Sequence, residues 1–211
     1  MTDAELLYAA AAVLFVASFT PGPNNAICCA LAANGGFWRA FPWSLGVMSG
    51  FPLLMGFAGF GLGGLFDRIP ELHLVVKTGG ALFLLYLAWK IAHTAPPNKN
   101  GENKTRKENK RDKRSGIALF AEALLFQWIN PKAIAVTIST TAAYARPGEH
   151  LTGDVLALMI MSSLFALGST TIWTLIGAAI SRYLTSPKAH KVFNCLMALL
   201  LTAAIPPIFF V

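Results

Sequence analysis

The feature that most constrains this chain is a break in its first long apolar run, which extends from Leu6 to Leu31. The break has the sequence Thr-Pro-Gly-Pro-Asn-Asn and occupies residues 20–25. Proline removes a backbone N–H and clashes with the carbonyl four residues earlier, and glycine weakens a helix further. A helix through this run must therefore break near its middle. Inside a membrane, unpaired backbone is tolerated only where protein buries it or where it lines a cavity.

The composition is typical of a membrane protein. Hydrophobic residues make up 55% of the 211 residues, charged residues only 13%, and the mean hydropathy is +0.56. Ordinary soluble domains carry roughly 25% charged residues, so this chain has too few to cover a soluble surface. A helical membrane protein of this length has room for about six spans of ~20 residues. We therefore predict an all-α integral membrane protein with a single membrane domain over residues 1–211.

Six apolar segments along the chain are predicted to be transmembrane helices. The second contains Gly46 and Gly50, a G-x-x-x-G spacing that lets neighbouring helices approach closely. We interpret this pair as ordinary helix packing, although glycine-rich faces also permit a homodimer. The six segments cover about residues 4–31, 41–65, 72–92, 116–144, 155–180 and 192–211.

The basic residues set the predicted orientation in the membrane. Eight of them lie between Lys99 and Arg114, within a polar stretch over residues 95–115. No folded basic domain or aromatic interleaving accompanies this run, which argues against nucleic-acid binding and for a solvated cytoplasmic loop. With that loop inside, thirteen basic residues lie on the cytoplasmic side and three on the outside, which follows the positive-inside rule. Six spans then place both termini outside.

Three predicted spans lie on each side of this loop, so the two halves must have opposite orientations. Repeat 1 covers about residues 4–94 and repeat 2 about residues 116–211. The first helix of each repeat is broken by proline, at 21–23 in the first and at Pro131 in the second. Paired, interrupted apolar segments at corresponding positions indicate the binding site of an inverted-repeat transporter. We therefore predict two inverted three-helix repeats with a substrate site at the two breaks.

At these residues the chain resembles the LysE/RhtB family of bacterial amino-acid exporters. The matching pieces are the six-segment layout, the glycine-rich second segment, Thr20-Pro-Gly-Pro-Asn-Asn25, Lys77-Thr-Gly-Gly-Ala81, Tyr86-Leu-Ala-Trp-Lys90 and Gln127-x-x-Asn130-Pro-Lys-Ala133. The resemblance covers nearly the whole chain. It implies a carrier of the bacterial inner membrane that expels amino acids or their derivatives, driven by protons. One departure is the stretch 194–197, Asn-Cys-Leu-Met, where the family pattern leads us to expect glycine.

Within this family the pattern is closest to the cysteine/O-acetylserine exporters. The resemblance therefore favours a neutral polar substrate such as cysteine, O-acetylserine, threonine or homoserine. Homoserine, threonine and leucine exporters share much of the same pattern. The partners that the resemblance implies are a small amino-acid substrate, protons and the lipid bilayer.

An amino acid is a zwitterion, so its site needs one receptor for the carboxylate and another for the ammonium. After each break a new half-helix begins with free N–H groups and the positive end of its dipole, which suits a carboxylate. Carbonyls freed by the prolines suit the ammonium, and amide side chains can donate or accept. The predicted substrate-binding residues are Pro21, Gly22, Pro23, Asn24, Asn25, Gln127, Asn130, Pro131 and Lys132.

Several of these side chains have a second interpretation. The amides can instead satisfy the broken backbone. Lys132, the only basic residue deep in a span, can bind the substrate carboxylate, lose its proton during transport, pair with a carboxylate or extend along a water-filled cavity. Glu122 is the most deeply embedded carboxylate and hence the first candidate for carrying the coupled proton, although it can also extend to the membrane interface.

Other classes of protein fit the sequence less well. An intramembrane enzyme needs a nucleophile with a base, or paired carboxylates, at one depth, and no span offers them, so we predict no catalytic residue. A divalent-cation exporter, the alternative function, needs Asp, Glu, His or Cys ligands in the core. Cys28 and Cys29 are adjacent and so point to different helix faces, which makes a poor metal site. We predict neither a metal nor a cofactor.

Overall fold

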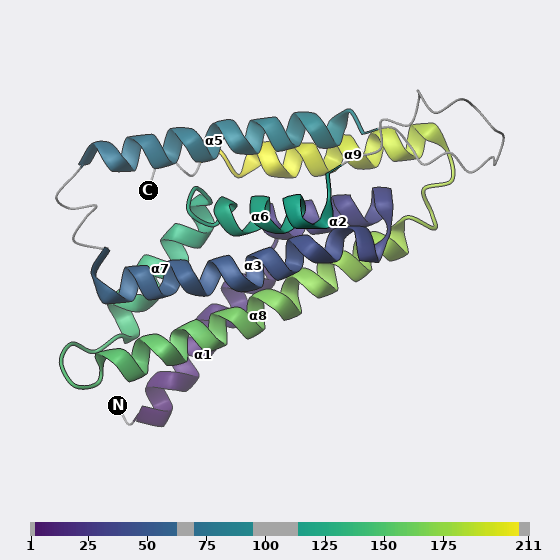
Figure 1. Ribbon diagram of the computed structural model, residues 1–211. Helices are drawn as coiled ribbons and strands as arrows, with labels where there is room; N and C mark the ends of the chain where they lie inside the picture. The colour runs from purple at the N-terminus through teal and green to yellow at the C-terminus, as the bar shows by residue number, and fades with distance from the viewer. Residues whose placement is uncertain (1–2, 63–69, 95–113, 207–211) are drawn as a thin grey trace.

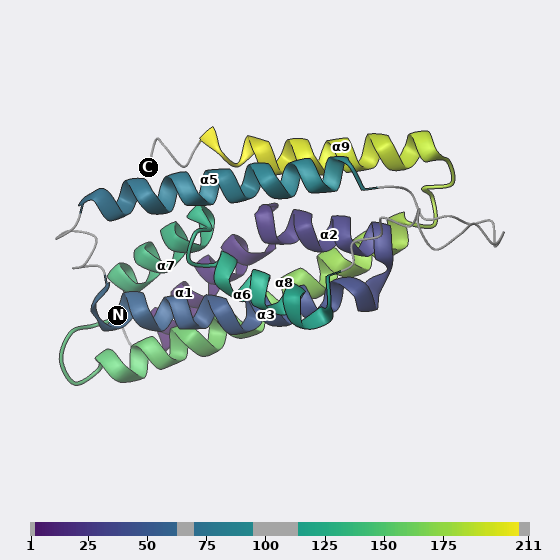
Figure 2. The same ribbon diagram turned by 45° about the horizontal axis from the view of Figure 1, so that its top comes forward.

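The computed structural model describes residues 3–62, 70–94 and 114–206, and every regular element in these ranges is helical. The helices form an elongated bundle and run back and forth between its two ends (Figure 1, Figure 2). Nearly all of the predicted basic loop lies outside the described residues. The all-helical prediction is confirmed for the part of the chain that the structure describes.

The first half of the chain begins with a bent pair of helices. α1 (Asp3–Phe19) and α2 (Pro23–Gly35) are inclined by 45° to each other across the predicted break. α3 (Phe37–Phe57) returns along the bundle and continues into the short helix η1 (Ala58–Leu62), and α5 (Pro70–Ala92) follows.

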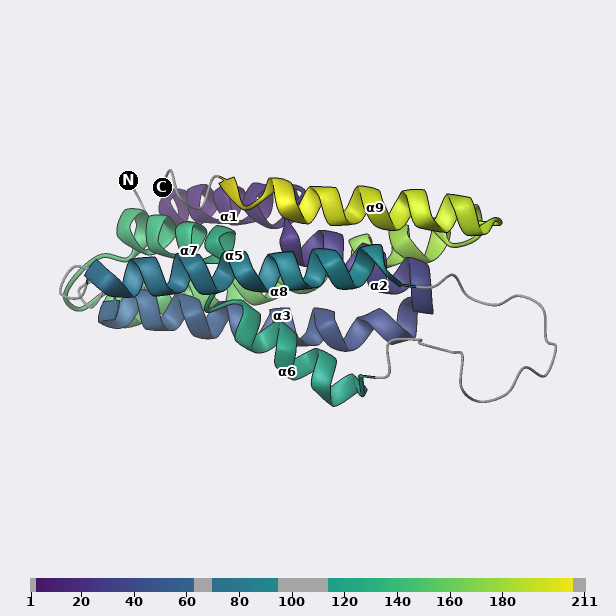
Figure 3. The same cartoon turned by 90° about the horizontal axis from the view of Figure 1, so that it is seen from above.

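The second half repeats this order of elements. α6 (Gly116–Phe126) and α7 (Pro131–Tyr144) are separated by the second predicted break, which lies near the middle of the bundle (Figure 3). The long helix α8 (Leu151–Ile180) and then α9 (Pro187–Ala203) complete the described chain. α9 packs along α5, and the two lie side by side at one face of the bundle (Figure 1, Figure 2).

Local chemistry fixes where these helices begin. α2, α7 and α9 each carry proline in the first turn, where its missing N–H has no helical partner to lose. The gap between the first two predicted segments is shorter in the structure than predicted, because Gly36 alone makes the turn between α2 and α3, with φ of +87°. The last segment also begins earlier than predicted, because Ser186 caps α9 by accepting the N–H of Ala189 at 3.1 Å.

The G-x-x-x-G pair in α3 packs closely against a neighbouring helix, as the sequence predicted, and that helix is α6. A Cβ atom at Gly46 would lie 2.3 Å from the carbonyl oxygen of Phe120, and one at Gly50 would lie 2.6 Å from that of Leu124. The same device joins α8 to α2, since a Cβ at Gly177 would lie 2.2 Å from the carbonyl oxygen of Cys29. These glycines therefore serve contacts within one chain.

Fewer of the described helices pass a simple length test for membrane spans than the six segments predicted. Phe37–Gly61 and Leu151–Ile180 are long and apolar enough to cross a membrane, and the bent pair α1–α2 makes a third if it counts as one span. α6 and α7 are each too short alone because their segment is broken, and α9 has only 17 residues. The inverted six-helix arrangement therefore remains a prediction at this point.

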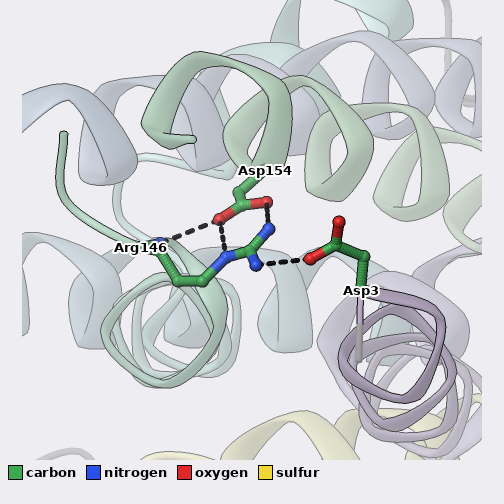
Figure 4. A network of polar contacts seen from close by, with 3 residues as sticks. All are labelled: Asp3, Arg146 and Asp154. Carbon is green, nitrogen blue, oxygen red and sulfur yellow. Dashed lines mark hydrogen bonds and ion pairs between the residues drawn. The ribbon is translucent and has the colours of Figure 1, made fainter. Parts of the chain in front are cut away.

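A charged cluster of Asp3, Arg146 and Asp154 ties the start of α1 to the turn between α7 and α8 (Figure 4). The guanidinium of Arg146 donates to both carboxylate oxygens of Asp154, at 2.9 and 2.8 Å, and to Asp3 at 2.6 Å. These bonds, chiefly those to Asp154, raise the pKa of Arg146 above its ordinary value. These ion pairs thus hold α1 against the start of α8 at one end of the bundle.

Candidate functional site

The two helix breaks are bonded to each other inside the bundle. The side-chain amides of Asn24 and Gln127, 103 residues apart, form a reciprocal pair. Nδ2 of Asn24 donates to Oε1 of Gln127 at 2.9 Å, and Nε2 of Gln127 donates to Oδ1 of Asn24 at 3.3 Å. Gln127 is fully buried, and its Nε2 also donates to the carbonyl of Ala123 at 2.7 Å. Two predicted site residues from different halves therefore lie in direct contact.

Lys132 makes the second connection between the breaks. From the first turn of α7, its Nζ donates to the Thr20 carbonyl at 3.0 Å, to the Thr20 hydroxyl at 2.8 Å and to the Pro21 carbonyl at 3.4 Å. Within the described residues Lys132 pairs with no carboxylate. Its charge instead faces the carbonyl end of α1, which is the negative end of that helix dipole.

Asn25 satisfies carbonyls that the first break leaves open. Its Nδ2 donates to Ser18 at 2.9 Å and to Thr20 at 3.0 Å, and the side chain is buried. Ser169 of α8 also donates to the Ser18 carbonyl, at 2.7 Å, and its hydroxyl lies 3.2 Å from Oδ1 of Asn25. Asn25 therefore bonds the backbone carbonyls at the break, which was one of the two roles that the sequence left open for it.

The helices that follow the two breaks begin differently. Asn130 caps α7, because its Oδ1 accepts the N–H of Lys132 at 3.2 Å. The N-cap of α2 is Gly22, which offers no side-chain oxygen. The backbone N–H groups of Asn24 and Asn25 meet no acceptor among the described residues. The start of α2 therefore keeps free donors at the positive end of its dipole.

A cavity of about 50 Å³, measured as the space open to the centres of water molecules, lies where α1, α2, α3, α7 and α8 meet. On this measure a single water needs ~10–15 Å³, so the cavity has room for a few waters. Most of the predicted substrate-binding residues line it. They are Gly22, Pro23, Asn24, Asn25, Gln127, Asn130 and Lys132.

The remaining predicted residues lie elsewhere. Pro21 and Pro131 shape the breaks without lining the cavity. Glu122 forms an ion pair with Arg114 at the start of α6 and is not part of the lining. Its role as proton carrier remains a prediction.

Sequence reasoning missed several residues of the lining, notably Phe51, Ser169 and Thr170. The available signal for the last two was the run of small polar residues along the fifth apolar segment. For Phe51 the sequence carried no signal, because one phenylalanine among many apolar residues has nothing to distinguish it.

The electrostatics of the cavity are simple, because Lys132 is the only charged side chain among the described residues that line it, and the other polar side chains there are amides and hydroxyls. Asn130 is 2% exposed, and its amide nitrogen meets no acceptor among the described residues. The site thus combines free amide donors with carbonyl oxygens. Among the described residues, no group of three His, Cys, Asp or Glu side chains is placed to hold a metal ion.

Two helices broken within an apolar bundle, with polar groups of both breaks around one small cavity, are typical of a membrane transporter. A model of the LysE type translocator family matches residues 15–204, and the chain belongs to this family. The protein is therefore a multi-pass membrane transporter and not an enzyme.

Curated relatives are similar over nearly their whole length. A cysteine/O-acetylserine efflux protein of Salmonella typhimurium is 29% identical over 195 residues, which cover 92% of this chain and 93% of the relative. A leucine efflux protein of Enterobacter sp. (strain 638) is 28% identical over 190 residues, 88% of this chain and 86% of the relative. A cysteine/O-acetylserine efflux protein of Escherichia coli O9:H4 is 25% identical over 196 residues, 92% of this chain and 93% of the relative. No solved structure shows a significant match.

Proposed function

We propose that this protein exports amino acids from the cytoplasm across the bacterial inner membrane, in exchange for protons. The favoured substrates are small neutral polar amino acids or derivatives such as cysteine, O-acetylserine, threonine and homoserine. The names of the relatives support amino-acid export, and both cysteine/O-acetylserine and leucine efflux proteins occur among them. The observation that carries the proposal is the bonding of the two breaks around one cavity.

The chemistry of the cavity suits a zwitterion. A carboxylate finds donors in the free backbone N–H groups of Asn24 and Asn25 and in the side-chain Nδ2 of Asn130. Beside the cavity, where Lys132 ends, carbonyl oxygens of Thr20 and Pro21 are acceptors for an ammonium. Because amides and hydroxyls form the rest of the polar lining, a small polar side chain is the best match.

We propose further that the chain crosses the membrane six times as two inverted three-helix repeats. The packing supports this arrangement, because α1 packs on α8 while α3 packs on α6. Exchanging the two halves converts one of these contacts into the other. The pairs α3–α8 and α5–α9 are converted into themselves by the same exchange.

The proposed orientation places the 95–115 loop in the cytoplasm and both termini outside. α5 ends and α6 begins at one end of the bundle, whereas α1 begins at the other (Figure 1). A cytoplasmic loop therefore goes with an external N-terminus. Glu122, about two turns into α6 from its loop end, stays the candidate for carrying the proton.

The test is export from cells loaded with single amino acids, with and without a proton uncoupler. We expect the wild type to export one class of neutral amino acid in an uncoupler-sensitive manner. Asn130→Ala should reduce this export at least about tenfold, because it removes a hydrogen bond to the substrate carboxylate. Asn24→Ala keeps its backbone N–H but loses the side-chain pair with Gln127 that joins the two breaks, and should reduce export to a similar extent. Each variant should be present in the membrane at the wild-type amount.

Asn34→Ala is the matched control. Asn34 forms a similar reciprocal amide pair with Asn194, at 2.8 and 3.3 Å, but it does not line the cavity. It should keep export within about twofold of wild type. Normal export by both site variants would exclude the proposed site, and absence of any amino-acid export would favour the cation-exporter alternative, tested by metal tolerance.

A further inference from the structure

The ammonium group of Lys132 already occupies a place where a substrate ammonium would bind. Three oxygens surround Nζ, from the carbonyl and hydroxyl of Thr20 and the carbonyl of Pro21, at 2.8 to 3.4 Å. A lysine ammonium has three N–H donors, as has the ammonium of a free amino acid. The same three acceptors therefore suit either group.

The first break also positions the two ends of a zwitterion. α1 ends at Phe19 and presents carbonyls, while α2 begins at Pro23 and presents the free N–H groups of Asn24 and Asn25. The negative end of one helix dipole therefore faces the positive end of the next across three residues. An amino acid with its carboxylate on α2 directs its ammonium towards the Thr20 and Pro21 oxygens.

The oxygens that bind Lys132 lie at the surface of the bundle, and the hydrogen bonds of the Lys132 side chain all come from its Nζ. Asn25 fixes the Thr20 carbonyl through a bond of 3.0 Å, and Thr20 and Pro21 are exposed on the bundle. The Lys132 side chain passes over Gly22, where a Cβ would lie 3.0 Å from both its Cδ and its Nζ. A flexible side chain bound to dipoles rather than to a carboxylate can leave without stranding a negative charge.

We propose that Lys132 is a tethered competitor for the substrate ammonium, which fills the receptor when the site is empty and is displaced when substrate binds. This inference rests on the proposed function and assigns Lys132 to the ammonium end of the site rather than to the carboxylate. It restricts the substrates to compounds with a free primary ammonium, and N-acylated amino acids are excluded.

The sign of the change in apparent affinity tests this role. In liposomes containing purified protein, Lys132→Met should lower the half-saturation concentration for the exported amino acid about tenfold, because substrate no longer competes with a charged hydrogen-bond donor. Its maximal rate should fall, since nothing returns to the receptor to release substrate. Lys132→Arg keeps a cation and should not gain affinity. A higher half-saturation concentration in Lys132→Met would overturn the proposal, because it would make Lys132 a ligand of the carboxylate.

A second arm does not depend on amino-acid transport. Methylammonium should raise the unfolding temperature of detergent-solubilised Lys132→Met but not of wild type, and tetramethylammonium, which has no N–H, should raise neither. Gly22→Ala keeps the lysine but crowds its Nζ. Methylammonium should therefore raise the unfolding temperature of this variant, but by less than that of Lys132→Met. If wild type exports no amino acid, the proposed function fails while this arm still decides the receptor. Equal responses of wild type and Lys132→Met to methylammonium would refute the proposed competition between Lys132 and the substrate ammonium.

Discussion

At the scale of single residues, the amides at the two breaks have distinct roles. Asn25 satisfies backbone carbonyls, Asn130 caps α7, and Asn24 pairs with Gln127. The sequence indicated that amides belong at these breaks, because proline leaves carbonyls without partners. Which group each amide contacts depends on how distant segments pack, and a single sequence does not contain that information.

Asn25→Ala should lower the unfolding temperature of the purified protein. The substitution leaves the carbonyls of Ser18 and Thr20 with fewer donors in a buried setting, a loss of about 1–3 kcal/mol. Thr202→Ala is the control, because its hydroxyl makes an exposed bond to the Leu199 carbonyl near the end of α9. Equal unfolding temperatures for Asn25→Ala and the control would contradict the backbone role.

Lys132 shows a different limit of sequence reasoning. A lysine within a span must find a partner, and the sequence left a carboxylate, a substrate or a water-filled cavity open. The partner in the structure is backbone oxygen at the end of α1. That end became available only because the first break lies beside the second, a contact between the two halves of the chain.

At the scale of helices, the proline breaks and the glycine contact were predictable from local chemistry. The G-x-x-x-G spacing predicted close helix approach, and the structure identifies α6 as the neighbour of α3. The identity of that neighbour was not predictable, because the spacing describes one surface and not the surface that meets it. The Asn-Cys-Leu-Met stretch also has a structural explanation, since Asn194 is buried and bonded to Asn34.

Gly46→Ala should destabilise the protein strongly and reduce its amount in the membrane. The added Cβ would lie 2.3 Å from a backbone oxygen of α6, so the two helices must separate. Gly153→Ala in α8 is the matched control, because a Cβ there meets nothing within 4 Å. Thermal unfolding in one detergent compares the two, and similar unfolding temperatures would show that α3 and α6 are not closely packed.

At the scale of the whole molecule, the sequence predicted the helical membrane class, and the family match agrees with it. It did not anticipate the charged cluster at one end of the bundle. Asp3, Arg146 and Asp154 lie on three separate parts of the chain, and their meeting follows from the direction in which α1, α7 and α8 run (Figure 4).

Arg146→Gln should lower the unfolding temperature more than Asp3→Asn does. The side chain of Asp154 is 11% exposed and would lose a bidentate partner, whereas that of Asp3 is 74% exposed and remains hydrated. Exposed pairs contribute little and are screened by salt. The measurement is unfolding at low and high salt, and a larger effect of Asp3→Asn would reverse this ranking of the two contacts.

The bonds between the two breaks bear on how the cell keeps its ion gradients. The Asn24–Gln127 pair and the contact of Lys132 with Thr20 hold each interruption of the helices against the other. Unpaired backbone groups in the middle of a membrane would otherwise attract a continuous chain of water molecules, through which ions could leak. Because these bonds hold the two interruptions against each other around space for only a few waters, we expect the carrier without substrate to leak few ions at this place.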